Sequence, residues 1–467
     1  MPVEPYRLHP VAPTVALLTP DGEALSEHGE RLDFDDWPKG VRCYASYDTV
    51  YQLVRAGRGE ALTWNREEVK WRHARRDDGP LGWHPRPSDV SVIRLAFDDD
   101  APEITLRALA SWRDWLASYR AAPTGTTGSA AWSLLRARLE KPLYLAHRNM
   151  LPQFGDWPPL KFTCGGRIEK GPRGPGLYTG DLSHFDLPAA YASELGQLKY
   201  GGRWLDTSTV NVRHDPEWWA LEGRPVFVRA IVRVPDLDFG LLLRRPSRHG
   251  YLSAMLQQEL PFPRGKRVQG VWTWQELETA ISYGARVQRV LGVWAHLASG
   301  RPFVPWWEAV QAGRRMPGLA GVLAKATGNA LWGRFAMDPT LAGERHIRSM
   351  NGKLQDRKLW RRPGLPADHA LAETVSGRVR AKLTAAMLAA GTDLVCAHTD
   401  GLWTEQEQDA PEGWRCDKSA RRVDLLEPFQ LRWYPRGGGG PRVIMAGVPH
   451  LLAKETFESR WKDGGFA

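Results

Sequence analysis

The hydrophobic pattern predicts both helices and strands along the whole chain. Apolar residues recur at helical spacing in long segments, and β-branched or aromatic residues fill shorter runs. We expect helices at residues 103–122, 316–336 and 373–391, strands at 90–97 and 224–235, a strand leading into a helix at 176–195, and a βαβ-like unit at 270–297. A chain of 467 residues is too long for one simple core. The pattern therefore predicts a multidomain protein of the α/β class.

One predicted hairpin, residues 393–405, carries a single carboxylate at its tip. Thr399, Asp400 and Gly401 suit a tight turn between two apolar runs, and Gly401 can supply a positive φ. Taken alone, this is an ordinary hairpin. A carboxylate fixed at such a tip can also be one half of a two-metal site, provided that a second carboxylate lies nearby.

Asp186 is the candidate for that second carboxylate. It ends a predicted strand, and Tyr191 follows five residues later in the next turn or helix. Hard cations such as Mg²⁺ prefer carboxylate oxygens, and phosphoryl transfer to a nucleotide commonly uses a pair of such ions. Asp186 and Asp400 therefore form a candidate site for two metal ions.

The overall charge favours a polyanionic partner. The formal net charge is +10, and the 42% of hydrophobic residues exclude a disordered chain. No apolar run is long enough to predict a membrane span, and the first residues lack a secretory pattern, so we expect no membrane partner and a cytoplasmic protein. The four cysteines show no metal-binding or disulfide spacing, which predicts free thiols.

Six short motifs follow one another between residues 160 and 460. They are TCGG (163–166), DLPAAYAS (186–193), KATGNALWG (325–333), TVSGR (374–378), AHTDG (397–401) and RWY (432–434). In this order they resemble the motifs of the family B DNA polymerases, especially the protein-primed branch of small phages and linear plasmids. The family patterns are Tyr-x-Gly-Gly, Asp-x-x-Ser-Leu-Tyr-Pro-Ser, Lys-x3-Asn-Ser-x-Tyr-Gly, Thr-x-x-Gly-Arg, Tyr-x-Asp-Thr-Asp-Ser and Lys-x-Tyr.

The resemblance implies a role for each matched residue. Asp186 and Asp400, with the backbone carbonyl of Leu187, would bind two Mg²⁺ or Mn²⁺ ions, and Lys325 would assist catalysis at the triphosphate. Tyr191 would be a steric gate against ribonucleotides. The residues implied to contact the incoming dNTP are Tyr191, Arg314, Arg315, Lys325, Asn329 and Trp332. Those implied to contact template or primer DNA are Gly165, Gly166, Thr374, Arg378, Arg432 and Tyr434.

The resemblance also implies a right-hand polymerase divided along the chain. The expected parts are a reduced exonuclease-like α/β domain (1–155), the first part of the palm with the Gly-Gly link (156–240), an insertion or palm extension (241–300), the fingers (301–336), a basic insertion (337–372), the second part of the palm (373–434) and a short thumb (435–467). Such a protein would work in a bacterial or phage-infected cell.

The chain departs from the family pattern around Asp400. His398 replaces an Asp and Gly401 replaces a Ser, while Ala189 and Ala192 replace the Ser and Pro of the first palm motif. Histidine is a poor Mg²⁺ ligand. A neutral imidazole could hydrogen-bond a metal-bound water or the primer end, whereas a protonated one would repel metals, so activity is expected to rise across the histidine titration range. Alternatively, His398 only packs against the hairpin.

The N-terminal region is expected to lack proofreading. Its only early Asp-x-Glu, Asp21-Gly22-Glu23, follows Thr-Pro and is typical of a hairpin turn. The sequence therefore predicts a template-directed polymerase that adds dNTPs to a primer 3′-hydroxyl, borne by nucleic acid or by a terminal protein. Two alternatives remain: a nucleic-acid-binding module with a weakened polymerase site, and a primase-like or terminal-transferase enzyme on the same palm.

Overall fold

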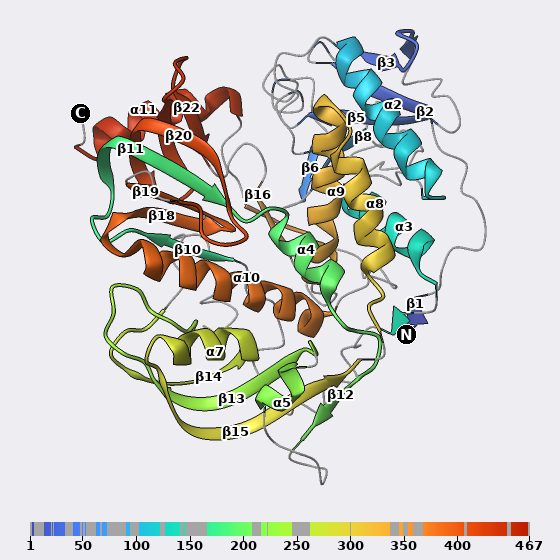
Figure 1. Ribbon diagram of the computed structural model, residues 1–467. Coiled ribbons are helices and arrows are strands. Elements are labelled where there is room, and N and C mark those ends of the chain that lie inside the picture. Colours follow the sequence, from blue (N-terminus) through green and yellow to red (C-terminus); the bar gives the residue numbers. More distant parts are fainter. Residues whose placement is uncertain are drawn as a thin grey trace.

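The computed structural model describes the chain in segments. They are residues 2–3, 14–19, 21, 23–32, 41–46, 49, 52, 62–65, 68–71, 90–93, 102–121, 127–140, 143–144, 166–207, 216–221, 223–244, 262–298, 300–336, 345–348, 354–357, 368–405, 409–445 and 450–465. Three larger sheets and a cluster of helices make up the architecture (Figure 1), which confirms the expected mixed α/β class.

The central unit is an antiparallel sheet of seven strands in the order β10-β18-β19-β11-β20-β21-β22. The strands are β10 (Arg167–Lys170), β11 (Gly176–Asp186), β18 (Leu394–Thr399), β19 (Gly401–Glu405), β20 (Arg415–Glu427), β21 (Gln430–Pro435) and β22 (Arg442–Met445). Helix α10 (His369–Ala390) covers one face, where Leu383 and Met387 pack on β18 and β19. The predicted hairpin and the strand ending at Asp186 are both confirmed.

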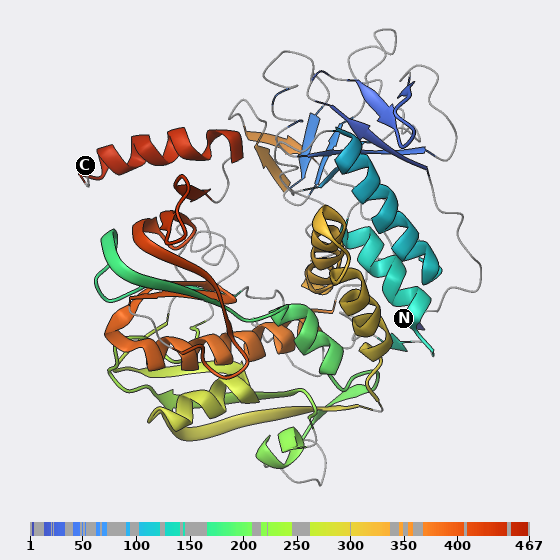
Figure 2. The same cartoon turned by 45° about the horizontal axis from the view of Figure 1, so that its top comes forward.

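A second sheet, in the order β12-β15-β13-β14, comes from residues 203–297. Its elements are β12 (Arg203–Asp206), α5 (Pro216–Leu221), β13 (Val226–Arg233), β14 (Arg267–Thr273), α7 (Trp274–Ser282) and β15 (Arg286–Leu297). The expected βαβ unit is present, with the antiparallel strand β13 lying between β14 and β15. Helix α7 covers one face and contacts α10, so α7 and α10 separate this sheet from the central one (Figure 2).

The N-terminal α/β unit shares its core with the helices that follow it. Its sheet has the order β4-β3-β2-β5-β8-β7-β6. The strands are β2 (Thr14–Leu18), β3 (Ala24–Ser26), β4 (Arg31–Leu32), β5 (Val41–Ser46), β6 (Leu62–Asn65), β7 (Glu68–Trp71) and β8 (Val90–Ile93), and the helices are α2 (Pro102–Ser118) and α3 (Thr127–Arg138). One hydrophobic core runs from Val15 through this unit to Val379 of α10.

Helices α2 and α3 pack on α8 (Val304–Arg314) and α9 (Gly318–Ala336), with α4 (Ala190–Gln197) alongside. The indole N–H of Trp112 donates to the Thr327 hydroxyl at 3.0 Å, and that of Trp115 donates to the Ala309 carbonyl at 3.2 Å. The predicted helices 103–122 and 316–336 are thereby confirmed, and they are partners of each other.

The remaining elements are short. They are the pairs β1 (Pro2–Val3) with β9 (Leu143–Tyr144) and β16 (Arg345–Arg348) with β17 (Leu354–Arg357), the 3₁₀ turn η5 (Gly391–Asp393), and α11 (His450–Asp463). Cys43, Cys396 and Cys416 are free thiols, and Cys164 lies outside the described residues. Among the helices that the structure describes, none has the length and apolarity to cross a membrane.

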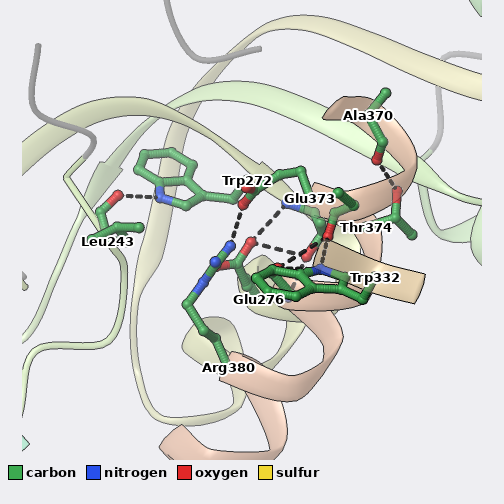
Figure 3. A network of polar contacts seen from close by, with 11 residues as sticks. Leu243, Trp272, Glu276, Trp332, Ala370, Glu373, Thr374 and Arg380 are labelled. Atoms are coloured by element: carbon green, nitrogen blue, oxygen red, sulfur yellow. Dashed lines mark hydrogen bonds and ion pairs between the residues drawn. The ribbon is translucent and has the colours of Figure 1, made fainter. Parts of the chain in front are cut away.

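A buried polar network joins α10 to the second sheet (Figure 3). The Arg380 guanidinium is 1% exposed and contacts Glu276 at 2.8 Å and also Glu373. Glu276 completes a capping box with Thr273 at the start of α7. On an adjacent face of α10, the Trp332 indole N–H lies 3.0 Å from the Ala372 carbonyl and 3.1 Å from the Ser376 hydroxyl. Helix α10 is therefore fixed to α7 and α9 by buried polar contacts.

Replacing Arg380 tests the importance of this network. Arg380→Met would leave Glu276 and Glu373 buried without their cation, which should lower the free energy of unfolding by ~3–5 kcal/mol. Denaturant titration measures the loss. The control is Arg31→Met, because Arg31 pairs with Glu23 at the surface and should change stability by only ~0–1 kcal/mol. Equal losses in the two variants would contradict the assignment.

Candidate active site

The register of the central sheet brings the two predicted carboxylates together. Asp186 at the end of β11 lies opposite Gly401 of β19, and the Leu187 N–H donates to the Asp400 carbonyl at 2.9 Å. Burial raises the pKa of Asp400; the Thr399 hydroxyl, which donates to the carboxylate at 2.7 Å, lowers it, and the charge of Asp186 raises it again. The two like charges are therefore close enough to repel each other, and a divalent cation between them would relieve that repulsion.

The backbone is strained beside each carboxylate. Of the described non-glycine residues, only Arg120, Ala189 and Thr399 have a positive φ, and Ala189 (54°) and Thr399 (49°) flank the site. The Asp400 N–H donates to the His398 carbonyl at 2.7 Å across Thr399. A β-branched residue at positive φ is an outlier, and such residues gather at functional sites. The expectation that Gly401 supplies the positive φ is wrong, because Thr399 takes that role.

Gly401 is required for a different reason. A Cβ at position 401 would lie 2.8 Å from Nε2 of His184. That imidazole is 3% exposed, stacks on His398 with ring centroids 5.2 Å apart and contacts Trp403. The departures from the family pattern at 398 and 401 are therefore one packing arrangement, in which both residues accommodate His184.

A bulge in β20 completes the histidine pair. The register passes from Phe185 opposite Cys416 to His184 opposite Lys418, which leaves Asp417 as the extra residue. The Asp417 carboxylate accepts a hydrogen bond from Nδ1 of His184. Nε2 of His184 then accepts, at 3.3 Å, from Nε2 of His398. Bulges commonly redirect side chains beside active sites.

His398 remains neutral in this setting. Burial is the main reason that its pKa falls to about 3, with further lowering by the charges of His184 and Lys418. The expected rise in activity across the ordinary histidine titration range is therefore not supported. The observed stacking on His184 and the contact with Phe429 favour the alternative in which His398 packs against the hairpin.

Cationic side chains surround the carboxylates. The charge of Lys325, exposed on α9, lowers the pKa of Asp400. Burial lowers the pKa of Arg314, the charge of Arg415 lowers it further, and the charge of Asp186 raises it. Nη1 of Arg314 is buried and has no hydrogen-bond partner in the described structure. Arg315 is exposed at the end of α8, so the structure brings Arg314 to the carboxylates.

Arg415 was not expected from the sequence. It lies opposite Asp186 in β20, and its Nη2 lies 3.2 Å from Oδ2 of Asp186. Its side chain is 51% exposed, so the guanidinium can exchange this carboxylate for another anion at little cost.

An aromatic wall bounds the site on the α4 and α9 side. Lys325, Asn329 and Trp332 lie at helical spacing on one face of α9. The Trp332 ring packs on Tyr191, with centroids 4.8 Å apart. A Cβ on Gly166 would lie 2.4 Å from the Tyr191 hydroxyl, so only glycine fits there. Oδ1 of Asn329 is buried and has no hydrogen-bond partner in the described structure.

Two of the residues expected to contact DNA are largely buried. Arg378 is mostly buried beside Glu194, 3.6 Å away, and its Nε has no hydrogen-bond partner among described groups. The Thr374 side chain is buried and donates to the Ala370 carbonyl. Gly165 lies outside the described residues.

Arg432 of the RWY segment on β21 is also committed to packing. The Arg432 side chain contacts Asp424 at 2.7 Å and Glu458 of α11, so it holds α11 to the sheet. Arg422 stacks on the Tyr434 ring at 4.9 Å. The side chains of Thr374 and Arg432 are therefore not presented to a primer in the expected manner.

The early Asp-x-Glu forms a turn, as predicted. β2 and β3 are an antiparallel hairpin, Asp21 lies in their connection, and the Thr19 N–H donates to the Glu23 carbonyl at 2.9 Å. The Glu23 carboxylate pairs with Arg31 at 3.0 Å.

The oxygen atoms of Asp186, Leu187 and Asp400 are of the type that hard cations prefer. No group of three or more His, Cys, Asp or Glu suited to a metal is found among the described residues. The donors are instead two carboxylates and the carbonyl of Leu187, all oxygen, which suits Mg²⁺ or Mn²⁺ when a substrate supplies further oxygens.

The fold that carries this site is that of a DNA polymerase. The particular protein it resembles is Phi29 DNA polymerase: the orthorhombic crystal form has a TM-score of 0.58 and 13% identity, covering 93% of this chain and 90% of that chain. The ternary complex with primer-template DNA and incoming nucleotide substrates has a TM-score of 0.59 and 12% identity, and the match covers 96% of this chain and 94% of that chain. The complex with single-stranded DNA has a TM-score of 0.55 and 13% identity, and the match covers 95% of this chain and 92% of that chain.

No protein-family model and no curated protein matches the sequence. At 12–13% identity the likeness establishes the fold. The resemblance to protein-primed family B polymerases is confirmed at that level.

A double-mutant cycle tests the packing of Gly401. Gly401→Ser should lower the free energy of unfolding by ~1–3 kcal/mol, because the added Cβ meets the buried His184 ring. In a His184→Ala background the same change should cost less than half as much. Thermal or denaturant unfolding of the four proteins measures this coupling. An identical cost in both backgrounds would refute the explanation.

Proposed function

We propose that the chain is a template-directed DNA polymerase that adds dNTPs to a primer 3′-hydroxyl. The observation that carries this proposal is the pairing of β11 with β19, which joins Asp186 to Asp400 within the fold of Phi29 DNA polymerase. In one of the similar structures, that polymerase is complexed with primer-template DNA and incoming nucleotide substrates. By analogy, template, primer and dNTPs are the proposed partners of this chain, with a terminal protein as a candidate bearer of the first hydroxyl.

Asp186, Asp400 and the Leu187 carbonyl would hold two Mg²⁺ or Mn²⁺ ions. When bound, these ions would activate the primer hydroxyl and stabilise the pyrophosphate leaving group. The hydrogen bond from Leu187 to the Asp400 carbonyl keeps both carboxylates on one rigid support. Positioning of this kind matters because misplacement by about 1 Å can cost roughly a hundredfold in rate.

The positively charged side chains near the carboxylates would bind the triphosphate of the incoming nucleotide. Lys325 and Arg314 lie on α9 and α8 and are electrostatically coupled to Asp400 and Asp186. The unpaired Nη1 of Arg314 is a donor that a phosphate oxygen would satisfy. Arg415 would leave Asp186 for the same triphosphate when metal arrives.

Tyr191 would exclude ribonucleotides. Its ring is 9% exposed and is held between Trp332 and Gly166, so it cannot yield to an additional hydroxyl on the sugar. Asn329 would lie on the same side of the nucleotide as Tyr191, where its unpaired Oδ1 would accept a hydrogen bond from the nucleotide. Arg378 and Tyr434 would contact the primer strand.

The domain assignment is part of the proposal. The central sheet with α10 would be the palm, α8 and α9 the fingers, α11 the short thumb, and the second sheet together with β16 and β17 the insertions. The first insertion would then begin near β12 and not at residue 241, because β12 and β13 belong to the second sheet. The N-terminal unit would be an exonuclease-like domain without proofreading. Asp21 and Glu23 support this, because they stand in a hairpin turn and Glu23 pairs with Arg31.

Neutralising either carboxylate should abolish synthesis. Asp186→Asn and Asp400→Asn should each reduce dNTP incorporation on a primed template by at least about a thousandfold, while primer-template binding changes little. The matched control is Asp181→Asn, an exposed position on the same strand β11, which should retain activity. Substantial extension by either site variant would eliminate the proposed centre.

Shortening Tyr191 should relax sugar selection. Tyr191→Val removes the ring that Trp332 and Gly166 support, so the preference for dNTPs over rNTPs should fall by about tenfold or more. Single-nucleotide incorporation with each substrate measures the ratio. Tyr178→Val, a buried tyrosine on β11 outside the site, controls for general loosening. An unchanged ratio in Tyr191→Val would assign the gate elsewhere.

A further inference from the structure

The second sheet has one packed face and one partly open face. Val228, Ala230 and Val232 of β13 point towards α7, and the alternate residues Phe227, Arg229, Ile231 and Arg233 point to the opposite side. At one end this opposite side is covered by Trp204, Phe227 and Trp294, which belong to the main core. Its remaining part carries the arginines of the three strands: Arg229, Arg233, Arg267, Arg286 and Arg289.

Three of these arginines form a row across the sheet. Arg233 lies directly opposite Arg267 of β14 on one side and Arg286 of β15 on the other. All three are exposed, and none has an ion-pair partner within the described part of the chain. Like charges directly opposite in neighbouring strands destabilise a sheet. The arrangement therefore opposes folding unless an anion offsets the repulsion.

Acidic residues are missing from the strands that carry the row. β13, β14 and β15 contain no Asp or Glu. The nearest acids in the sequence, Asp236 and Asp238, follow β13 in an exposed turn. The only acid of β12, Asp206, lies opposite Trp294 at the covered end. The open face consequently has one sign of charge.

The positive charge and the spacing of the arginines suit this face to a phosphate backbone. Strands about 4.8 Å apart give a row of about 10 Å, which matches roughly three phosphate-to-phosphate steps of one strand at about 3.4 Å of helix axis per step. Gln269 and Ile231 lie in the next row, and no aromatic anchor or apolar pocket of the kind that centres a protein interface is present on the open part that the structure describes. Contacts to backbone without base readout need only such a charged surface.

We propose that this arginine face binds nucleic-acid backbone as a second contact, separate from the polymerase site. Helices α7 and α10 lie between the two (Figure 2), so the bound segment is not the primer terminus. The proposal rests on the proposed function only in taking DNA as the polyanion that the protein handles.

A two-step binding experiment tests the arginine face. The protein is first saturated with an unlabelled hairpin primer-template, and a labelled single-stranded oligonucleotide or a labelled duplex is then titrated at several KCl concentrations. Arg233→Gln/Arg267→Gln/Arg286→Gln should weaken the second binding at least tenfold and reduce its log–log salt slope by about 2 on the single strand, at about 0.7 per phosphate. Tighter binding of one labelled form identifies which strand state the face takes.

The control variant removes the same number of positive charges but leaves the row of Arg233, Arg267 and Arg286 intact. Arg107 of α2, Arg301 before α8 and Arg421 of β20 are all exposed, and Arg107→Gln/Arg301→Gln/Arg421→Gln should leave the second binding unchanged. Equal binding by both triple variants, no second binding by the wild type, or tighter binding of polyglutamate than of oligonucleotide would overturn the proposal. Failure of the hairpin to bind or to be extended would instead count against the polymerase function, and the labelled DNA would still report on the arginine face.

Discussion

The antiparallel register between β11 and β19 is the constraint on which the site depends. It sets Asp186 opposite Gly401 and lets the Leu187 N–H reach the Asp400 carbonyl at 2.9 Å. A slip of one residue would turn every side chain of β11 to the other face of the sheet and separate the carboxylates. Buried Phe185 and Leu182 hold the register, because they pack in the cores on either side of the sheet.

Strain and packing at the hairpin tip follow from that register. Thr399 is held at a positive φ, and its hydroxyl donates to Asp400. Beneath it, His184 and His398 stack, and Asp417 fixes the ring of His184. Where the family B pattern has a further Asp, this chain has the neutral His398, so the proposed metal site has fewer negative charges. Such a site should hold cations less strongly by electrostatics alone.

Much of this arrangement was predictable, and the misses have physical causes. Strand ends, helices and the two carboxylates follow from local periodicity and motif order. Asp417 and Arg415 could not be found, because a bulge and a cross-strand partner depend on pairing between distant segments. A signal for His184 was present: it precedes Asp186 by two residues, as His398 precedes Asp400, and period-two alternation puts such residues on one face. Gly401 was misassigned because its neighbour in space, His184, is remote in sequence.

Asp186 and Asp400 are proposed to hold two metal ions jointly. Counting bound Mn²⁺ by electron paramagnetic resonance tests this proposal most directly, in a complex with a chain-terminated primer-template and the next correct dNTP. We expect two Mn²⁺ ions per protein, with spin coupling between them that is lost in either Asp→Asn variant. Mn²⁺ binding that is indifferent to both substitutions, or a single uncoupled ion in the wild-type complex, would contradict it.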